Sequence, residues 1–322
     1  MARFDLSAQD LRAHHPHVAE PDDFDDFWDE TLTEARQHAA GVDRTPVASA
    51  LSSFEVFDVT FPGFAGDGIR AWLVLPRSRA HPLPGIVEFV GYGRGRGLAH
   101  ERLHWPAAGF AQLIVDTRGQ GSTWGTGGST ADPHGAGPST AGFLTRGIED
   151  PREYYYRRVF TDAVRAVDAM RTFDEIDPTR IAVTGNSQGG LIAIAAAGLA
   201  SGLMAALPTA PILCDVARVV GLTDAEPHAE IARYLAVHRD RADDVFRTLS
   251  YFDGVALARR ATAPALFGCG HLDTIAPPSG VYAAYNAWAG PHEMVDYPWN
   301  GHETGEGAHW LRQVEWLRAA TA

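Results

Sequence analysis

The chain has 322 residues, enough for one large domain or two small ones, and its 45% hydrophobic content is ordinary for a globular protein. A formal net charge of −13 argues against nucleic acid as a partner, because the phosphate backbone requires a basic surface. No segment is long and apolar enough to span a bilayer, and the amino terminus lacks a secretory-signal layout, so we expect a cytoplasmic protein without a membrane partner.

The first predicted elements are a helix and a hairpin. Between residues 22 and 39, apolar side chains recur at helical spacing on one face, opposite acidic residues: Phe24, Phe27, Trp28, Leu32 and Ala35. Extended sequence follows at 54–61 and 69–76, separated by the turn-like "GFAGDG". These two runs predict a hairpin at the edge of a sheet.

Further along the chain, short apolar runs alternate with helical segments. The runs cover residues 85–91, 111–116, 180–185, 264–270 and 292–298. Runs of this kind are typical of strands buried on both faces, so we expect a parallel sheet flanked by helices. One helix, at 156–170, precedes the third strand, and a Gly/Ser/Thr/Pro-rich segment at 118–151 precedes that helix. Loops of that length are usually functional or mobile.

A possible nucleophile lies where the strand at 180–185 meets an Ala-rich helix. Gly185-Asn186-Ser187-Gln188-Gly189 matches the G-x-S-x-G nucleophile elbow. Its glycines allow a sharp bend that would raise the Ser187 hydroxyl above the sheet edge. The bend would also leave the Gln188 amide at a helix N-terminus, where it can stabilise negative charge. A Gly/Ser turn without function is the alternative. The chain contains no lysine, which excludes a phosphate-binding loop of the Walker type and a Ser-Lys pair.

A serine nucleophile needs a base, and the base needs an acid that fixes its tautomer. In this fold both follow late strands, the acid first. Asp273 follows the strand at 264–270, and His302 follows the strand at 292–298. Two strand ends therefore supply the missing residue types in the expected order.

Three residues compete for these roles. His271 is a rival base, but it is beside Asp273 on the same loop. Asp296 is a rival acid that falls inside a predicted strand. Glu303 is another, but it adjoins His302 in sequence and cannot easily reach the far ring nitrogen. Asp273 and His302 are therefore favoured.

The oxyanion of a tetrahedral intermediate needs a second donor beside the Gln188 amide. The loop after the strand at 85–91 usually supplies it, and here it reads "GYGRG". We assign this role to the Tyr92 amide; one such donor is worth about 2.7–4 kcal/mol in the transition state. A glycine-rich turn without special purpose is the alternative.

The remaining features limit the number of domains and the kinds of ligand that we expect. Residues 222–250 form a helical excursion that could act as a lid or an oligomer contact, and no second domain is evident. The two cysteines, Cys214 and Cys269, offer no disulfide framework. A histidine tract at 14–17 has no cluster of cysteines or carboxylates at ligand spacing, so we expect no metal.

Three motifs and a wider similarity relate the chain to a known family. "RGQ" at 118–120, "GNSQGG" at 185–190 and "HE" at 302–303 occur in order, and the similarity covers nearly the whole chain. The chain resembles the acetyl xylan esterase and cephalosporin-C deacetylase family, carbohydrate esterase family seven of the α/β-hydrolase superfamily. The resemblance implies a single α/β-hydrolase domain over 1–322, with an N-terminal helical extension. It also implies a role in catalysis for five residues: Ser187, Asp273, His302, Tyr92 and Gln188.

The resemblance also implies an activity and an assembly. Members remove acetyl groups from short acetylated xylo-oligosaccharides and cephalosporins, need no metal or other cofactor, and commonly form homohexamers. Arg118, Gln120 and Glu303 would then hold the catalytic residues in position without contacting the substrate. We expect Arg118 to brace a carboxylate and to hold the loop that carries His302.

Two positions depart from the family pattern. Val90 stands where the oxyanion loop usually begins with histidine, and Ile212 stands where an aromatic residue is usual. We expect both near the acyl or alcohol group of the substrate, where they would affect specificity.

These residues together predict a serine carboxylesterase for small acetyl esters, with an acyl-enzyme intermediate. A peptidase, a thioesterase or a general short-chain esterase of the same fold is the alternative within enzymes. A non-catalytic binding protein of this fold would require a broken triad, and all three residue types are present.

Overall fold

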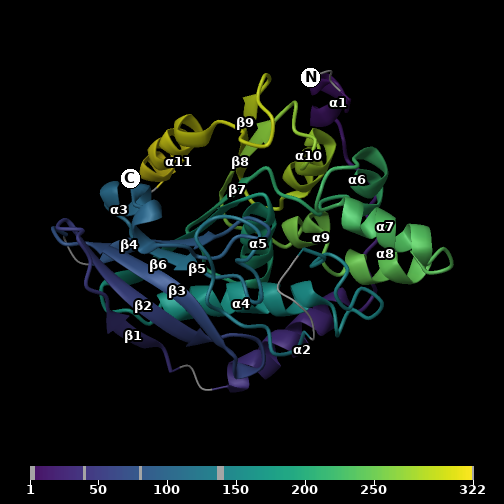
Figure 1. Cartoon of the computed structure of the whole chain (residues 1–322). Helices are drawn as coiled ribbons and strands as arrows, with labels where there is room; N and C mark the ends of the chain where they lie inside the picture. Colours follow the sequence, from purple (N-terminus) through teal and green to yellow (C-terminus); the bar gives the residue numbers. More distant parts are fainter. Residues whose placement is uncertain (1–3, 39–40, 80–81, 136–140, 321–322) are drawn as a thin grey trace.

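The computed structural model describes residues 4–38, 41–79, 82–135 and 141–320. In this part of the chain, nine strands form one sheet in the order β1-β2-β3-β5-β4-β6-β7-β8-β9 (Figure 1). Their bounds are β1 Asp43–Pro46, β2 Phe54–Pro62, β3 Gly68–Pro76, β4 Leu83–Phe89, β5 Ala111–Val115, β6 Ile176–Asn186, β7 Ala205–Thr209, β8 Ala265–Gly270 and β9 His292–Tyr297. The six strands β4 to β9 pair with one another in parallel. β1 pairs with β2, β2 with β3, and β3 with β5, all antiparallel. The predicted hairpin (β2 and β3) and the mostly parallel sheet are confirmed, but β1, which was not predicted, forms the edge outside the hairpin.

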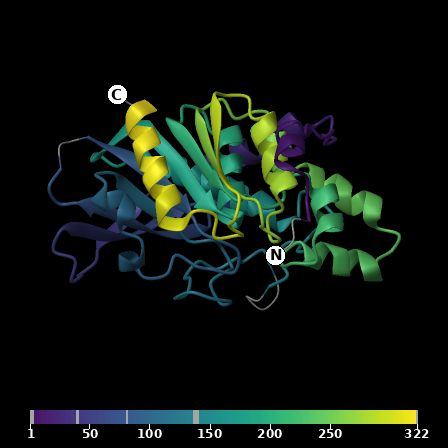
Figure 2. The same cartoon turned by 90° about the horizontal axis from the view of Figure 1, so that it is seen from above.

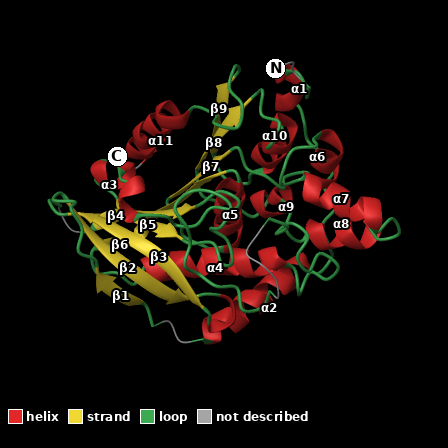
Figure 3. Ribbon diagram, viewed as in Figure 1, coloured by secondary structure: helices red, strands yellow, loops and turns green. Residues whose placement is uncertain are grey.

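Helices cover both faces of the sheet (Figure 3). Along each central strand alternate side chains face opposite sides, so Val87 and Val183 join a large core with one set of helices. That set includes α2 Phe24–Gln37, α4 Tyr155–Met170, α5 Gln188–Leu199, α9 Gly254–Ala258 and α10 Pro278–Ala287. Ile86 and Ala182 face the other way, into a smaller core with α3 His104–Ala107 and α11 Glu306–Ala320.

The predicted N-terminal helix packs as its pattern indicates. Its five apolar residues are all 5% exposed or less, and Trp28 lies against Phe160 of α4 and Phe252. The Trp28 indole N–H donates to the Tyr251 carbonyl (3.1 Å), which satisfies its one polar atom. The extension is therefore part of the main core. A short helix, α1 Ala8–Arg12, precedes it.

The helical excursion predicted at 222–250 consists of α7 Ala229–Val237 and α8 Ala242–Ser250, and α6 Val216–Leu222 directly precedes it. Figures 1 and 2 show α7 and α8 at the end of the molecule opposite the β2–β3 hairpin. No helix among the described residues is long and apolar enough to cross a membrane.

Candidate active site

Ser187 occupies a strained turn between β6 and α5. Its φ of 63° and ψ of −121° lie outside the regions that a non-glycine residue normally adopts, and such strain clusters at functional sites. A Cβ at Gly185 would lie 2.3 Å from the Gly189 backbone, and a Cβ at Gly189 would lie 2.3 Å from the Phe89 carbonyl oxygen. The glycines are needed because backbone segments approach closely. Ser187 Oγ makes no hydrogen bond within the described residues.

His302 and Asp273 meet at the carboxyl edge of the sheet. His302 Nδ1 lies 2.8 Å from Asp273 Oδ2, and Asp273 is 1% exposed. Asp273 Oδ1 accepts from the amides of Ile275 (2.8 Å) and Ala276 (2.9 Å), which fix the carboxylate. The acid can therefore hold the imidazole with Nε2 directed outward as a proton acceptor.

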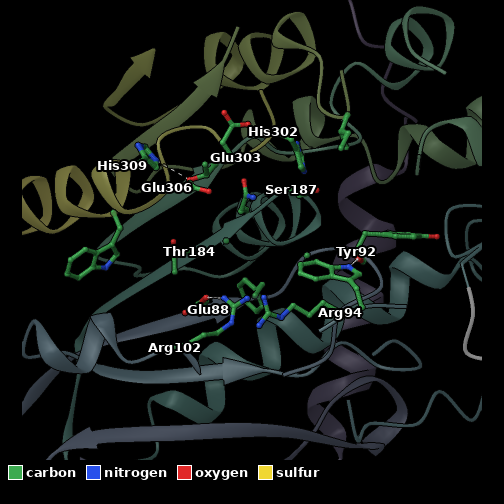
Figure 4. A pocket seen from close by; sticks show the side chains of 18 of the residues that line it. Glu88, Tyr92, Arg94, Arg102, Thr184, Ser187, His302, Glu303, Glu306 and His309 are labelled. Carbon is green, nitrogen blue, oxygen red and sulfur yellow. Dashed lines mark hydrogen bonds and ion pairs between the residues drawn. The ribbon is translucent and has the colours of Figure 1, made fainter. Parts of the chain in front are cut away.

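Ser187 and His302 line the same pocket (Figure 4). No hydrogen bond joins the hydroxyl to the imidazole among the residues described. Catalytic hydrogen bonds are often long in ligand-free enzymes and shorten when substrate binds, so this arrangement is compatible with proton transfer from Ser187 to His302.

The rival residues are engaged elsewhere. His271 Nε2 lies 2.7 Å from Asp296 Oδ1, and that oxygen also accepts from the Tyr282 hydroxyl (2.7 Å). Glu303 accepts from Asn300 Nδ2 (3.0 Å) and from the Gly301 amide (3.1 Å), so it shapes the turn that carries His302.

Two backbone amides near Ser187 are unengaged. Neither the Tyr92 amide nor the Gln188 amide donates to another group in the described part of the chain. The peptide after Tyr92 is anchored on both sides: Trp124 Nε1 donates to the Tyr92 carbonyl (2.7 Å), and the Gly93 amide donates to Gln120 Oε1 (2.7 Å). These amides can serve as oxyanion donors.

Gln120 connects the two segments that carry these amides. Its Nε2 donates to Gln188 Oε1 (2.9 Å) and to the Tyr155 hydroxyl (3.0 Å). Gln188 Oε1 also accepts from the Tyr156 hydroxyl (2.8 Å), and Gln188 Nε2 donates to the Val90 carbonyl (3.3 Å). Gln120, Gln188 and both tyrosines are at most 4% exposed, so these hydrogen bonds are shielded from bulk solvent and are stronger than they would be in water.

Replacing Gln120 with leucine should lower kcat for an ester substrate of the predicted serine nucleophile by about 10²-fold with little change in KM. The variant leaves the Gly93 amide unpaired, and a displacement on the order of 1 Å at the reacting centre costs about that much. Steady-state kinetics, with the thermal midpoint as a check on folding, would measure the effect. An unchanged kcat would show that the network does not position the amides.

Arg118 braces a carboxylate as expected, that of Asp162, but none of its partners among the described residues lies on the His302 loop, so that part of the prediction was wrong. Its guanidinium is fully buried and pairs with Asp162 (2.6 Å), Asp67 (2.9 Å) and Asp132 (3.4 Å). The Arg118 carbonyl accepts from the Tyr155 hydroxyl (2.6 Å). These contacts fix the loop after β5, two residues before Gln120. Arg118 thus acts on the oxyanion side of the site.

The pocket has a volume of about 700 Å³, within the range of about 300–1,000 Å³ that holds drug-sized ligands. The helical excursion contributes Glu226, Pro227 and Glu230 to its lining. The Tyr92 hydroxyl donates to Glu230 Oε1, and Glu230 Oε2 accepts from the Leu144 amide (3.0 Å). Burial raises the pKa of Glu230. The excursion therefore forms part of the pocket wall.

Val90 and Ile212 do not line this pocket, contrary to the expectation that they lie beside the substrate. Val90 packs with Val56, Val74 and Ile114 in a separate apolar cluster, because its side chain points to the opposite side of the loop. Ile212 is 1% exposed and belongs to the large core.

Sequence reasoning did not find Tyr155, Tyr156, Trp124 or Glu230. The two tyrosines lie on a helix predicted only as core, and Trp124 lies in the long polar loop. An aromatic residue in such a loop is a weak signal. Glu230 is 138 residues from Tyr92, so nothing local predicts their contact.

His228 links the excursion to the loop after β8. It is fully buried; its Nδ1 lies 3.0 Å from the Ile275 carbonyl and its Nε2 accepts from the Leu213 amide (3.2 Å). Both partners are satisfied only by the neutral ring, and burial lowers the pKa of His228 to about 4. Burial lowers the pKa of His309 to about 4 as well.

The free energy of unfolding should therefore fall as the pH drops from about 6.5 to about 4. In that range the unfolded chain binds protons that the folded histidines do not, whereas above pH 6.5 neither state binds them. Burial raises the pKa of Asp253 to about 6, which opposes the trend below that pH. In His228→Gln the fall in the free energy of unfolding should be smaller by up to about 1.4 kcal/mol per pH unit. Urea unfolding at pH 7, 6 and 5 would measure this free energy. The same dependence on pH in both proteins would contradict the assignment of His228.

Comparison with known proteins agrees with this geometry. The model of the family described as acetyl xylan esterase (AXE1) matches residues 1–320. The acetyl esterase Axe7A of Xylanibacter ruminicola is 27% identical over 94% of this chain and 68% of its own length.

Two solved structures cover nearly the whole chain. The acetyl xylan esterase from Paenibacillus sp. R4 has a TM-score of 0.91 and 36% identity, covering 98% of this chain and 99% of its own. Acetyl xylan esterase 1 from Thermoanaerobacterium sp. JW/SL YS485 has a TM-score of 0.90 and 30% identity, covering 99% and 100%. The α/β-hydrolase fold predicted from the sequence is thereby confirmed.

Proposed function

Because the chain belongs to the acetyl xylan esterase family and is a carboxylic ester hydrolase, we propose that it deacetylates small acetylated compounds such as xylo-oligosaccharides or cephalosporin C through Ser187, His302 and Asp273. One observation carries the mechanism. A strained serine with an unengaged hydroxyl shares a pocket with an imidazole that a buried carboxylate already holds.

The reaction starts when Ser187 Oγ attacks the acetyl carbonyl carbon and His302 Nε2 accepts the hydroxyl proton. The amides of Tyr92 and Gln188 hold the negative oxygen of the tetrahedral intermediate. Asp273 stabilises the imidazolium through Nδ1–H. The carbon–oxygen bond to the alcohol then breaks, and His302 returns its proton to the leaving oxygen.

Water completes the cycle by the same route. His302 takes a proton from the water, the hydroxide attacks the acetyl–serine ester, and a second oxyanion occupies the same pair of amides. Collapse of this intermediate releases acetate and restores the Ser187 hydroxyl. No group other than these five residues is required for proton or charge balance.

A substrate profile tests the proposal. Purified protein should release acetate from acetylated xylobiose and from cephalosporin C. It should not cleave peptides or acyl thioesters of similar size. Preferential cleavage of a peptide or a thioester would favour the alternative activities and contradict this proposal.

A homohexamer in the cytoplasm is the proposed setting. The chain mass is 34.7 kDa, so light scattering in solution should give six times that value. A mass equal to the single chain would remove this part of the proposal without affecting the chemistry.

A further inference from the structure

Three central strands contribute polar side chains to the floor of the pocket, directly beyond the apolar side chains that they contribute to the small core. On one sheet face, each strand changes from a residue of the small core to a polar pocket residue two positions later. The pairs are Ile86 and Glu88 on β4, Ala182 and Thr184 on β6, and Leu207 and Thr209 on β7. We call the part of the pocket above Glu88 and Thr184, bounded by Arg102, Trp105 and Trp310, the distal arm.

The distal arm is too far from Ser187 to serve an acetyl group. Thr184 lies on β6 and Ser187 follows the end of that strand, three residues later, which corresponds to at most about 10 Å for an extended chain. In Figure 4, Thr184 lies between Ser187 and the pair formed by Glu88 and Arg102. An acetyl carbonyl at Ser187 Oγ cannot extend that distance, so only the alcohol portion of the ester can occupy the arm.

The polar groups of the arm exceed what the fold needs. Glu88 is 6% exposed in the middle of the sheet, and it pairs with Arg102 Nη1 and accepts from Gln112 Nε2. Apolar residues at such positions would often stabilise a core equally well or better. On two of the side chains that line the arm, Arg102 Nε and Trp310 Nε1 are buried without a partner among the described residues. Buried unpaired groups of this kind usually bind an ordered water.

The charge of the whole pocket, of which the arm is one part, limits which ligands can enter. The pocket lining contains more carboxylates than arginines: Glu88, Glu226, Glu230, Glu303 and Glu306 against Arg94 and Arg102. Each arginine is already paired, Arg94 with Glu101 (3.3 Å) and Arg102 with Glu88. A bound carboxylate would therefore meet repulsion without an uncommitted cation, whereas hydroxyl groups can both donate and accept here.

Aromatic side chains complete the lining. Trp105, Trp124 and Trp310 border the pocket, and Trp124 is 50% exposed. Flat apolar faces beside hydrogen-bonding groups suit a sugar ring, whose C–H face is apolar and whose edge carries hydroxyls.

We propose that the distal arm binds the alcohol portion of the acetyl ester and selects a neutral, hydroxyl-rich alcohol over one that carries a carboxylate. Glu88 and Arg102 determine this specificity as a hydrogen-bonding pair. The inference rests on the proposed function. It ranks neutral acetylated sugars above cephalosporin C, whose leaving group is anionic.

Two matched substrates test the selection. Acetylated methyl xyloside and acetylated methyl glucuronide differ by one carboxylate. The expected kcat/KM for the glucuronide is lower by about tenfold or more at low salt, and the gap narrows at 1 M salt because added ions screen the repulsion. Equal kcat/KM values for the two substrates, or a preference for the glucuronide, would overturn the proposal.

A double variant tests the residues. Glu88→Gln with Arg102→Met removes both charges together, so no unpaired buried ion remains. The ratio of kcat/KM for the xyloside to kcat/KM for phenyl acetate, whose alcohol is too small to fill the arm, should fall about tenfold, mainly through KM. Arg152→Met is the control, since Arg152 pairs with Glu30 at the surface and lies outside the pocket. An unchanged ratio in the double variant contradicts the assignment.

A second variant covers the case in which the double variant does not fold. Trp310→Phe keeps an aromatic ring but makes this wall of the arm smaller, and the same ratio should fall several-fold. An unchanged ratio in a folded Trp310→Phe protein also counts against the arm. If the unmodified protein hydrolyses neither ester, that result contradicts the proposed function. It is distinct from the results above that contradict the role of the distal arm.

Discussion

Replacing Ser187 with alanine should lower turnover of acetyl esters by a factor on the order of 10⁶ and leave the fold intact. The reason is that His302 and the two amides have no covalent chemistry to assist once the attacking oxygen is gone. Acetate release under saturating substrate would measure the loss. Alanine retains the Cβ, so the elbow backbone need not change.

The control for this variant is structural. Circular dichroism and the thermal midpoint should match those of the unmodified protein. Serine and alanine both carry a Cβ, so the backbone strain at a φ of 63° is similar in the two proteins. A variant that keeps a tenth of the activity would require another nucleophile and would refute the mechanism.

Replacing Asp273 with asparagine should lower kcat by about 10⁴-fold. The asparagine oxygen can still accept from the amides of Ile275 and Ala276, so the loop keeps its shape. Its amide nitrogen then faces His302 Nδ1 and favours the tautomer with the proton on Nε2. That tautomer cannot accept the Ser187 proton.

The chain contains a matched control for this variant. His271, on the same loop as Asp273, and Asp296, on β9, form a second His–Asp pair (2.7 Å), and neither residue lines the pocket. Asp296→Asn should therefore leave kcat within a factor of two. A large loss in Asp296→Asn with a small one in Asp273→Asn would reverse the assignment of the acid.

Strand ends are the reason that much of the site can be predicted from sequence. Parallel strands deliver residues that follow them to one edge, so Ser187, Asp273 and His302 could be placed together without knowing the loops. The apolar runs identified most of the strands for the same reason. β7 was missed because "AALPT" has small residues and a proline, which weaken the signal of a central strand.

Contacts between distant polar residues could not be predicted. The charge of Arg118 indicated a carboxylate partner, but its three partners come from separate segments at 67, 132 and 162. Val90 was expected beside the substrate because of its place in the oxyanion loop. Which side of a loop a side chain faces depends on the backbone turn, and the sequence does not state it.

The most direct test of the central claim is to identify the residue that diethyl p-nitrophenyl phosphate modifies. This reagent phosphorylates an activated serine, and peptide mass spectrometry locates the adduct. We expect one diethylphosphate per chain, on Ser187, formed in step with the loss of esterase activity and absent from Asp273→Asn on the same timescale. Complete inactivation with Ser187 unmodified, or with the adduct on another residue, would contradict the account.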